Sequence, residues 1–158
     1  MMVSMLRNLS SILDKAAAYA LANGIDPATM IESKLAPDMF NLARQVQSAA
    51  DAAKTGAARL TGEAPPSHPD TETTFHELKA RIAKSIAYVE GFTPAQINAG
   101  ADRSITIPAR GESHVFKNGG DYLTQFLIPN FFFHVTTAYG LVRQQGVEIG
   151  KMTYLTGA

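Results

Sequence analysis

The chain has 158 residues, a length that fits one domain, residues 1–158, around a single core. Lysine plus arginine and aspartate plus glutamate number 14 each, so the chain lacks the net charge that would hold a nucleic acid or an anionic membrane. The sequence therefore predicts no nucleic acid and no membrane among its partners. Cysteine is absent, which excludes disulfides, thiolate metal ligands and a cysteine nucleophile.

The first residues predict a helix and not a secretion signal. Asp14 and Lys15 interrupt the apolar pattern before any cleavage-site signal, so we expect a cytoplasmic protein. Apolar residues recur at spacings of three and four over residues 5–20, and Asn23-Gly24 supplies a helix end. Asp26-Pro27 then predicts a short helical turn.

A second long helix is predicted to begin with Pro37 at its first position and to end at Gly62. Its apolar stripe is rich in alanine, which lets a neighbouring helix approach closely. Residues 62–72 concentrate proline, glycine and small polar residues, and they predict a loop.

A third helix follows this loop, and its cap is Thr71, Thr73 or Thr74. Glu77 stands three residues beyond Thr74, which is the spacing of a capping box. An apolar face opposes a charged face along this helix: Phe75, Leu78, Ile82, Ile86 and Val89 against Glu77, Lys79, Arg81 and Lys84. Gly91 ends the helix, and Thr93-Pro94 predicts one more helical turn.

Residues 103–117 change to an alternating pattern and predict a small two-stranded hairpin. The last helix is predicted over residues 121–146, with Asp121 as its N-cap and a kink at Pro129. The apolar tail after it should lie back on the bundle. Together these elements predict a mainly α fold, a four-helix bundle with a small β-hairpin before the last helix, whose helix topology the spacing leaves open.

The candidate pocket lies near the Pro129 kink. His134 falls on the buried stripe of the last helix, where its imidazole is either a core group satisfied by neighbouring polar atoms or a ligand or catalytic base. Gln45 and Asn130 are the predicted partners of His134 in a structural hydrogen-bond network. Tyr139 is a candidate donor at the pocket rim.

Two further positions have competing explanations. Asp51 is a candidate carboxylate for a metal, and pairing with Lys54 or Arg44 is the structural alternative. His68, which precedes a proline in the loop, is expected to be solvated.

Three consecutive phenylalanines, Phe131, Phe132 and Phe133, cannot all face one core, because neighbouring residues are about 100° apart on a helix. At least one of them should meet a partner surface, which supports a homodimer. Burial under the C-terminal tail is the competing account.

Two long segments carry a family resemblance: LAPDMFNLARQVQSAADAAKTGAARLTG and FKNGGDYLTQFLIPNFFFHVTTAYGLVRQQGVEIGKMTYL. With the hairpin between them, they resemble a bacterial family of unknown function within the DinB/YfiT-like four-helix bundles. The resemblance implies a bundle that is often dimeric. It also implies that better known members hold a divalent metal with three histidines, one on the second long helix and two four residues apart on the last. Some of those members are implied to be metal-dependent thiol transferases.

The histidine pattern of that resemblance is mostly missing in this chain. If His134 matches the first histidine of the last-helix pair, the second position is Ala138; if His134 matches the second, the first is Asn130. The second long helix has no histidine. We therefore expect a degenerate site without a metal cofactor. If zinc, nickel or manganese does bind, the expected ligands are His134, Asp51 and Asp38.

Three hypotheses follow. The first is a cytoplasmic DinB-like bundle protein that binds a small-molecule ligand or acts in a stress response. The second is a metal-dependent hydrolase or thiol transferase with altered ligands centred on His134. The third is a purely structural oligomer.

Overall fold

The structure is a computed structural model that describes residues 1–109 and 111–158. Within these residues, four long helices form the bundle: α1 (Met2–Asn23), α3 (Leu42–Thr61), α4 (Phe75–Glu90) and α7 (Ile128–Gln144). Shorter helices are α2 (Pro27–Ile31), α5 (Pro94–Asn98), α6 (Gly119–Tyr122) and α8 (Lys151–Thr156). The antiparallel hairpin consists of β1 (Ile105–Ala109) and β2 (Glu112–Phe116). The predicted mainly α bundle with a hairpin before the last helix is confirmed.

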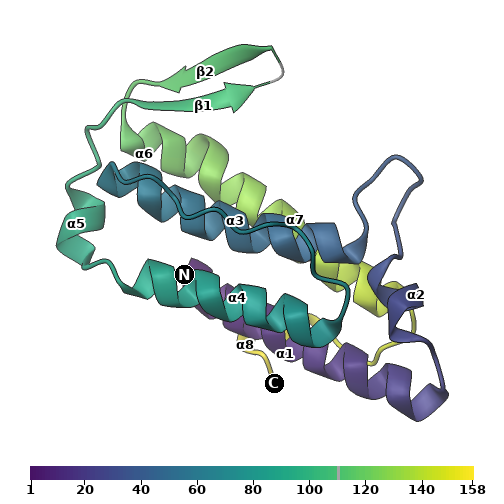
Figure 1. Ribbon diagram of the computed structural model, residues 1–158. Coiled ribbons are helices and arrows are strands. Elements are labelled where there is room, and N and C mark those ends of the chain that lie inside the picture. The colour runs from purple at the N-terminus through teal and green to yellow at the C-terminus, as the bar shows by residue number, and fades with distance from the viewer. Residues whose placement is uncertain (110) are drawn as a thin grey trace.

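Neighbouring helices do not simply alternate in direction. α3 and α4 run parallel to each other, and the connector between them returns along the length of α3 before α4 begins (Figure 1). We call residues 63–73 of this connector the crossover segment. α1 begins at the end of the bundle where α3 and α4 finish, and the chain also enters α7 from that end. α1 and α7 therefore run opposite to α3 and α4.

Helix ends follow the local sequence signals in most places. Gly24 adopts the left-handed conformation that ends α1, and Thr74 and Glu77 form the predicted capping box of α4. The predicted start of the second long helix at Pro37 is wrong. Asn41 caps α3 instead, its side chain accepting a hydrogen bond from the Arg44 N–H, because the preceding residues form a loop closed by a Lys34–Asn41 bridge.

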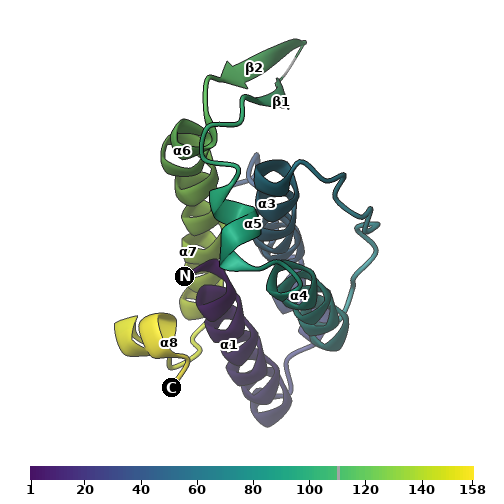
Figure 2. The same cartoon turned by 90° about the vertical axis from the view of Figure 1, so that its left-hand side faces the viewer.

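The four long helices enclose the main apolar core, and a separate, smaller apolar cluster joins the hairpin to the start of the last helix. It consists of Leu60, Ile105, Ile107, Phe116, Tyr122 and Leu127. Gly100 and Gly119 meet here beside Leu60, and a Cβ at Gly100 would collide with the Leu60 carbonyl oxygen. This close approach ties the end of α3 to the segments before and after the hairpin, and the hairpin itself extends beyond the helices (Figure 2).

The last helical rod contains a π-helical segment, η1 (Leu123–Leu127), between α6 and α7. The Ile128 N–H donates to the Leu123 carbonyl, a spacing of five residues. This wider turn comes just before Pro129, which lacks an N–H and would crowd a regular turn. The predicted N-cap at Asp121 is wrong, since the rod begins earlier and Asn118 accepts from the Asp121 N–H.

The tail lies back on the bundle, as predicted. Asn8 of α1 donates to the Tyr154 carbonyl, and Ser11 donates to the Gly157 carbonyl. In the part of the chain that the structure describes, no helix is long and apolar enough to cross a membrane.

Candidate functional site

The predicted contact between His134 and Gln45 is present across the α3–α7 interface. His134 Nδ1 lies 2.8 Å from Gln45 Oε1, and the Gln45 Nε2 donates to the Phe40 carbonyl at 3.4 Å. This second bond orients the amide, so Gln45 Oε1 is the acceptor and His134 Nδ1 carries the proton. The lone pair of the imidazole is therefore on Nε2.

His134 is half-buried, at the edge of the apolar stripe and not within it. Burial lowers the pKa of His134 below its ordinary value of 6.5, and the nearby Arg44 guanidinium lowers it further. The imidazole is thus neutral at pH 7. A neutral ring held in one tautomer can act as a base or as a single ligand, and it can equally serve as a fixed packing element.

The other predicted pocket residues differ in what they offer. Asn130 is half-buried one turn before His134, and Ala138 is fully buried without a donor group. Tyr139 packs edge-on against Tyr154, with ring centroids 5.6 Å apart. It lines a shallow pocket of about 190 Å³ between α7 and α8, with Thr136 and Lys151.

The residues present do not fit the three-histidine metal site that the resemblance implies. His134 contacts the Gln45 amide and the Phe133 ring and lies near the Arg44 guanidinium, and none of these groups is a usual ligand for zinc or nickel. Asp51 lies on the face of α3 that meets α4, where it pairs with Arg81 and Lys54, and Asp38 is exposed in the loop before α3. Among the residues described, no three histidine, aspartate or glutamate side chains gather into a possible metal site.

A polar seam between α3 and α4 contains the Asp51–Lys54 ion pair expected as the structural alternative for Asp51, whereas the burial of Arg81 in this seam was not predicted. Arg81 is only 2 % exposed, and its guanidinium pairs with Asp51 at 2.8 Å, Asp70 at 3.1 Å and Glu72 at 3.1 Å. It also donates to the Pro69 carbonyl. Lys54, 4 % exposed, pairs with Asp51 at 2.7 Å. The polar seam consists of Asp51, Lys54, Arg81 and Ser85, covered by His68, Asp70 and Glu72 of the crossover segment.

The seam corrects two expectations. The charged face of the third helix predicts an exposed Arg81, and the loop composition predicts a solvated His68. Arg81 is covered because the crossover segment lies over this side of the α3–α4 pair, and His68, which belongs to that segment, is half-buried with its Nδ1 inaccessible to solvent. Helical spacing shows which residues share a face, and it does not show that a loop will return over that face.

An apolar pocket of about 210 Å³, which we call the end pocket, opens where α1 begins and α3 and α4 finish. Its walls are apolar side chains: Met1, Met2, Val3, Ala53, Ala57, Leu60, Val89, Ile97 and Leu123. Small alanines on α3 leave the space, and Leu123 of the π-helical segment closes one side. The alanine-rich stripe was the available sequence signal.

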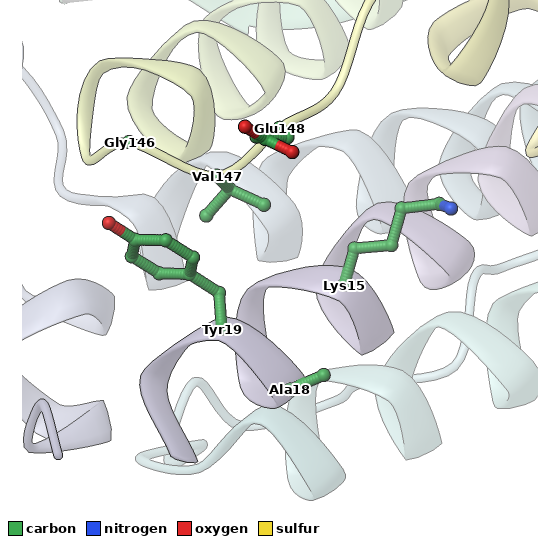
Figure 3. A pocket seen from close by; sticks show the side chains of 6 residues that line it. All are labelled: Lys15, Ala18, Tyr19, Gly146, Val147 and Glu148. Carbon is green, nitrogen blue, oxygen red and sulfur yellow. The ribbon is translucent and has the colours of Figure 1, made fainter. Parts of the chain in front are cut away.

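A larger and more open groove lies between α1 and the turn after α7 (Figure 3). In this groove the Tyr19 hydroxyl points toward Gly146. Lys15 and Glu148 lie farther along the groove, away from Gly146 (Figure 3). Its volume is about 560 Å³. Its polar groups lie at the surface, so the groove offers less exclusion of water than the end pocket.

The fold and site together define a helical bundle of four long helices, with a hairpin before the last helix and a single histidine on that helix facing α3. The chain belongs to the family described as Domain of unknown function (DUF1993), whose model matches residues 1–155. A crystal structure of a DinB family member from Shewanella denitrificans is similar to it, with 45% sequence identity and a TM-score of 0.86. That match covers 98% of this chain and 86% of the other. A search of curated proteins gives no match.

Proposed function

We propose that this DinB-like bundle binds a small apolar molecule in the end pocket. The observation that carries the proposal is a pocket of about 210 Å³ lined by nine apolar residues beside the π-helical segment. An apolar cavity of about 150 Å³ is known to stay dry and to bind benzene. A ring of that size, or a short aliphatic chain, therefore suits the end pocket.

The π-helical segment supports this choice of site. π-helical turns occur frequently at functional sites, because they displace side chains from the regular helical position. Here the segment presents Leu123 to the pocket, while Leu127 packs against Gly56 of α3. The packing of Leu127 against α3 thus holds in place the helical turn that carries Leu123, a wall residue of the end pocket.

We propose further that binding needs no metal. The Gln45 amide against His134 and the ion pairs of Asp51 with Arg81 and Lys54 support this view. A metal-dependent hydrolase or thiol transferase is accordingly the less supported reading. The proposed setting is the cytoplasm, which is an expectation from the sequence.

The binding proposal is tested by calorimetric titration with indole and 1-hexanol. Ala57→Leu should fill the end pocket and abolish saturable heat, and Ile97→Trp should block it from the rim. Ala87→Leu, at an exposed position on α4, is the matched control and should bind as wild type does. Absence of saturable heat in wild type, or equal heat in all four proteins, would contradict the proposal.

We also propose that the chain forms a homodimer through the outer face of α7. Phe133 is 54% exposed there, whereas Phe131 is fully buried. Residues 122–142 contain no aspartate, glutamate, lysine or arginine. A two-fold dimer places such a face against itself, so neither copy would bury an unpaired charge.

A further inference from the structure

The crossover segment, residues 63–73, is held to the bundle by polar contacts and not by an apolar core. Among the described residues, none of its side chains belongs to either apolar cluster, and its three prolines are all exposed. The Glu63 N–H donates to the Ala58 carbonyl, but residues 64–73 make no backbone-to-backbone hydrogen bond within the described part of the chain. Apolar burial and backbone pairing therefore do not fix this segment over the α3–α4 pair.

Arg81 of α4 makes most of the contacts that hold the segment. Its guanidinium donates to Asp70 at 3.1 Å, to Glu72 at 3.1 Å and to one backbone carbonyl of the segment at 3.0 Å. From α3, Arg44 pairs with Asp70, and Gln47 donates to Glu72 at 2.9 Å. Because these contacts centre on one arginine and two carboxylates, they can break together.

Arg81 keeps a partner when these contacts break. Asp51 lies 2.8 Å from the guanidinium and belongs to α3, not to the segment. Release of the segment therefore does not leave the Arg81 charge unpaired, which would be the costly outcome. The side chains of Asp70 and Glu72 are already in part exposed, so water can replace their bonds to Arg81 at small cost.

The closed arrangement leaves buried polar atoms without hydrogen bonds. In the residues that the structure describes, five buried side-chain atoms lack a hydrogen-bond partner: Asp51 Oδ1, His68 Nδ1, Arg81 Nε, Ser85 Oγ and Tyr88 Oη. The first four belong to the polar seam or its cover, and Tyr88 lies one helical turn beyond Ser85 on α4. Opening lets water reach these atoms, which favours the open form.

We propose that the crossover segment is a strap that opens and closes over the polar seam while the four-helix bundle stays folded, with Arg81 as its latch. Local opening of this kind occurs where few apolar contacts hold a segment. When open, the strap exposes Ser85 and Lys54 between α3 and α4. This motion goes beyond ligand binding in the end pocket and does not depend on it.

The two ends of the strap stay in place during this motion. Gly62 ends α3 in the left-handed conformation, and the Thr74–Glu77 capping box begins α4. The three prolines between these ends restrict the backbone, so the strap moves as a stiff piece.

Labelling of a single buried thiol tests the strap, since the chain has no cysteine of its own. Ser85→Cys places a thiol beneath the strap, and Val135→Cys places one in the main core, where both native residues are 0% exposed. N-ethylmaleimide should label Ser85→Cys at least roughly 100-fold faster than Val135→Cys. Low urea concentrations should speed the labelling of Val135→Cys steeply and that of Ser85→Cys little, because opening the strap exposes little surface.

The latch is tested in the Ser85→Cys background. Asp70→Asn and Glu72→Gln each keep the size of the side chain and remove its charge. Each should speed the labelling by about three- to tenfold. Asp102→Asn, at an exposed position before β1, is the matched control and should leave the rate unchanged.

A second thiol makes the test independent of one variant. Ala58 is fully buried and lies on the same face of α3 as Asp51 and Lys54. Ala58→Cys should therefore be labelled as Ser85→Cys is, and circular dichroism verifies that each variant is folded.

Two results would overturn the inference. One is labelling of both seam thiols at the rate and with the urea dependence of Val135→Cys, which would mean that the segment opens only when the whole chain unfolds. The other is fast labelling that neither Asp70→Asn nor Glu72→Gln changes, which would mean that the contacts with Arg81 are not the latch.

Discussion

At the scale of single residues, the His134–Gln45 pair links burial to protonation. The pKa of His134 is lower in the folded chain than its ordinary value of 6.5. Below about pH 6.5 the unfolded chain therefore binds more protons than the folded one, and the free energy of unfolding falls as the pH drops through the lowered pKa. Above about pH 6.5 this contribution to stability is fully present.

Replacing the imidazole should remove that pH dependence. His134→Gln retains a polar side chain but does not titrate, so it should lose less stability than wild type between about pH 7.5 and pH 5. Urea unfolding at several pH values measures this difference, and titrations elsewhere in the chain are common to both proteins. Identical losses in the two proteins would show that His134 does not carry the predicted linkage.

The residue scale also shows where sequence reasoning ends. The sequence places Gln45 and His134 beside the apolar stripes of two long helices, so a contact between them could be predicted, but it also requires α3 and α7 to be neighbours, which the spacing does not decide. The burial of Arg81 could not be predicted, because it depends on the path of residues 63–73. Likewise, only the three-dimensional contacts reveal that Asp51 is held by Arg81, which lies 30 positions further along the chain.

At the scale of elements, the π-helical segment packs closely against α3. A Cβ at Gly56 would lie 2.7 Å from Leu127 Cδ1, and Leu127 is itself almost fully buried. Gly56→Ala gains about 1 kcal/mol of helix propensity, but overpacking costs about 1–3 kcal/mol, so we expect a net loss of stability.

The matched control is Gly140→Ala on α7, where an added Cβ meets nothing within 4 Å. That substitution should stabilise the protein by about 0.5–1 kcal/mol, as measured by denaturant unfolding. If the Gly56→Ala variant were more stable than wild type, Leu127 would be able to move aside and the π-helical segment would be loosely packed.

Element boundaries were predictable where one side chain decides them. The Thr74–Glu77 capping box and the Gly24 helix end are such cases, since each needs only local geometry. The helix starts predicted at Pro37 and Asp121 were wrong, because each residue is compatible with a helix start but the capping hydrogen bonds are made by Asn41 and Asn118 nearby. The π-helical segment has no simple sequence signal besides the proline that follows it.

At the scale of the whole molecule, the four amphipathic helices in the sequence predicted a helical bundle. They did not predict that α3 and α4 pack in parallel. A connector of this length permits either direction, so only the fold decides it. The end pocket depends on this topology, because it forms where both helices finish beside the start of α1.

The proposed homodimer makes a prediction at this scale. Phe133→Lys places a charge at the centre of the proposed interface and should convert a dimer to a monomer in analytical ultracentrifugation. Leu21→Lys, at an 86% exposed position near the end of α1, should remain dimeric. A monomeric wild-type protein, or a dimeric Phe133→Lys variant, would rule out this interface.

The end pocket is tested most directly by NMR of protein labelled at its methionine methyl groups. Met1 and Met2 line the pocket, whereas Met30 and Met39 lie on or near α2 at the opposite end of the bundle. Titration with indole should shift the Met1 and Met2 signals to saturation and leave those of Met30 and Met39 in place. Shifts of the same size at all four methyl groups, or none at Met2, would contradict the proposal that this pocket binds an apolar molecule.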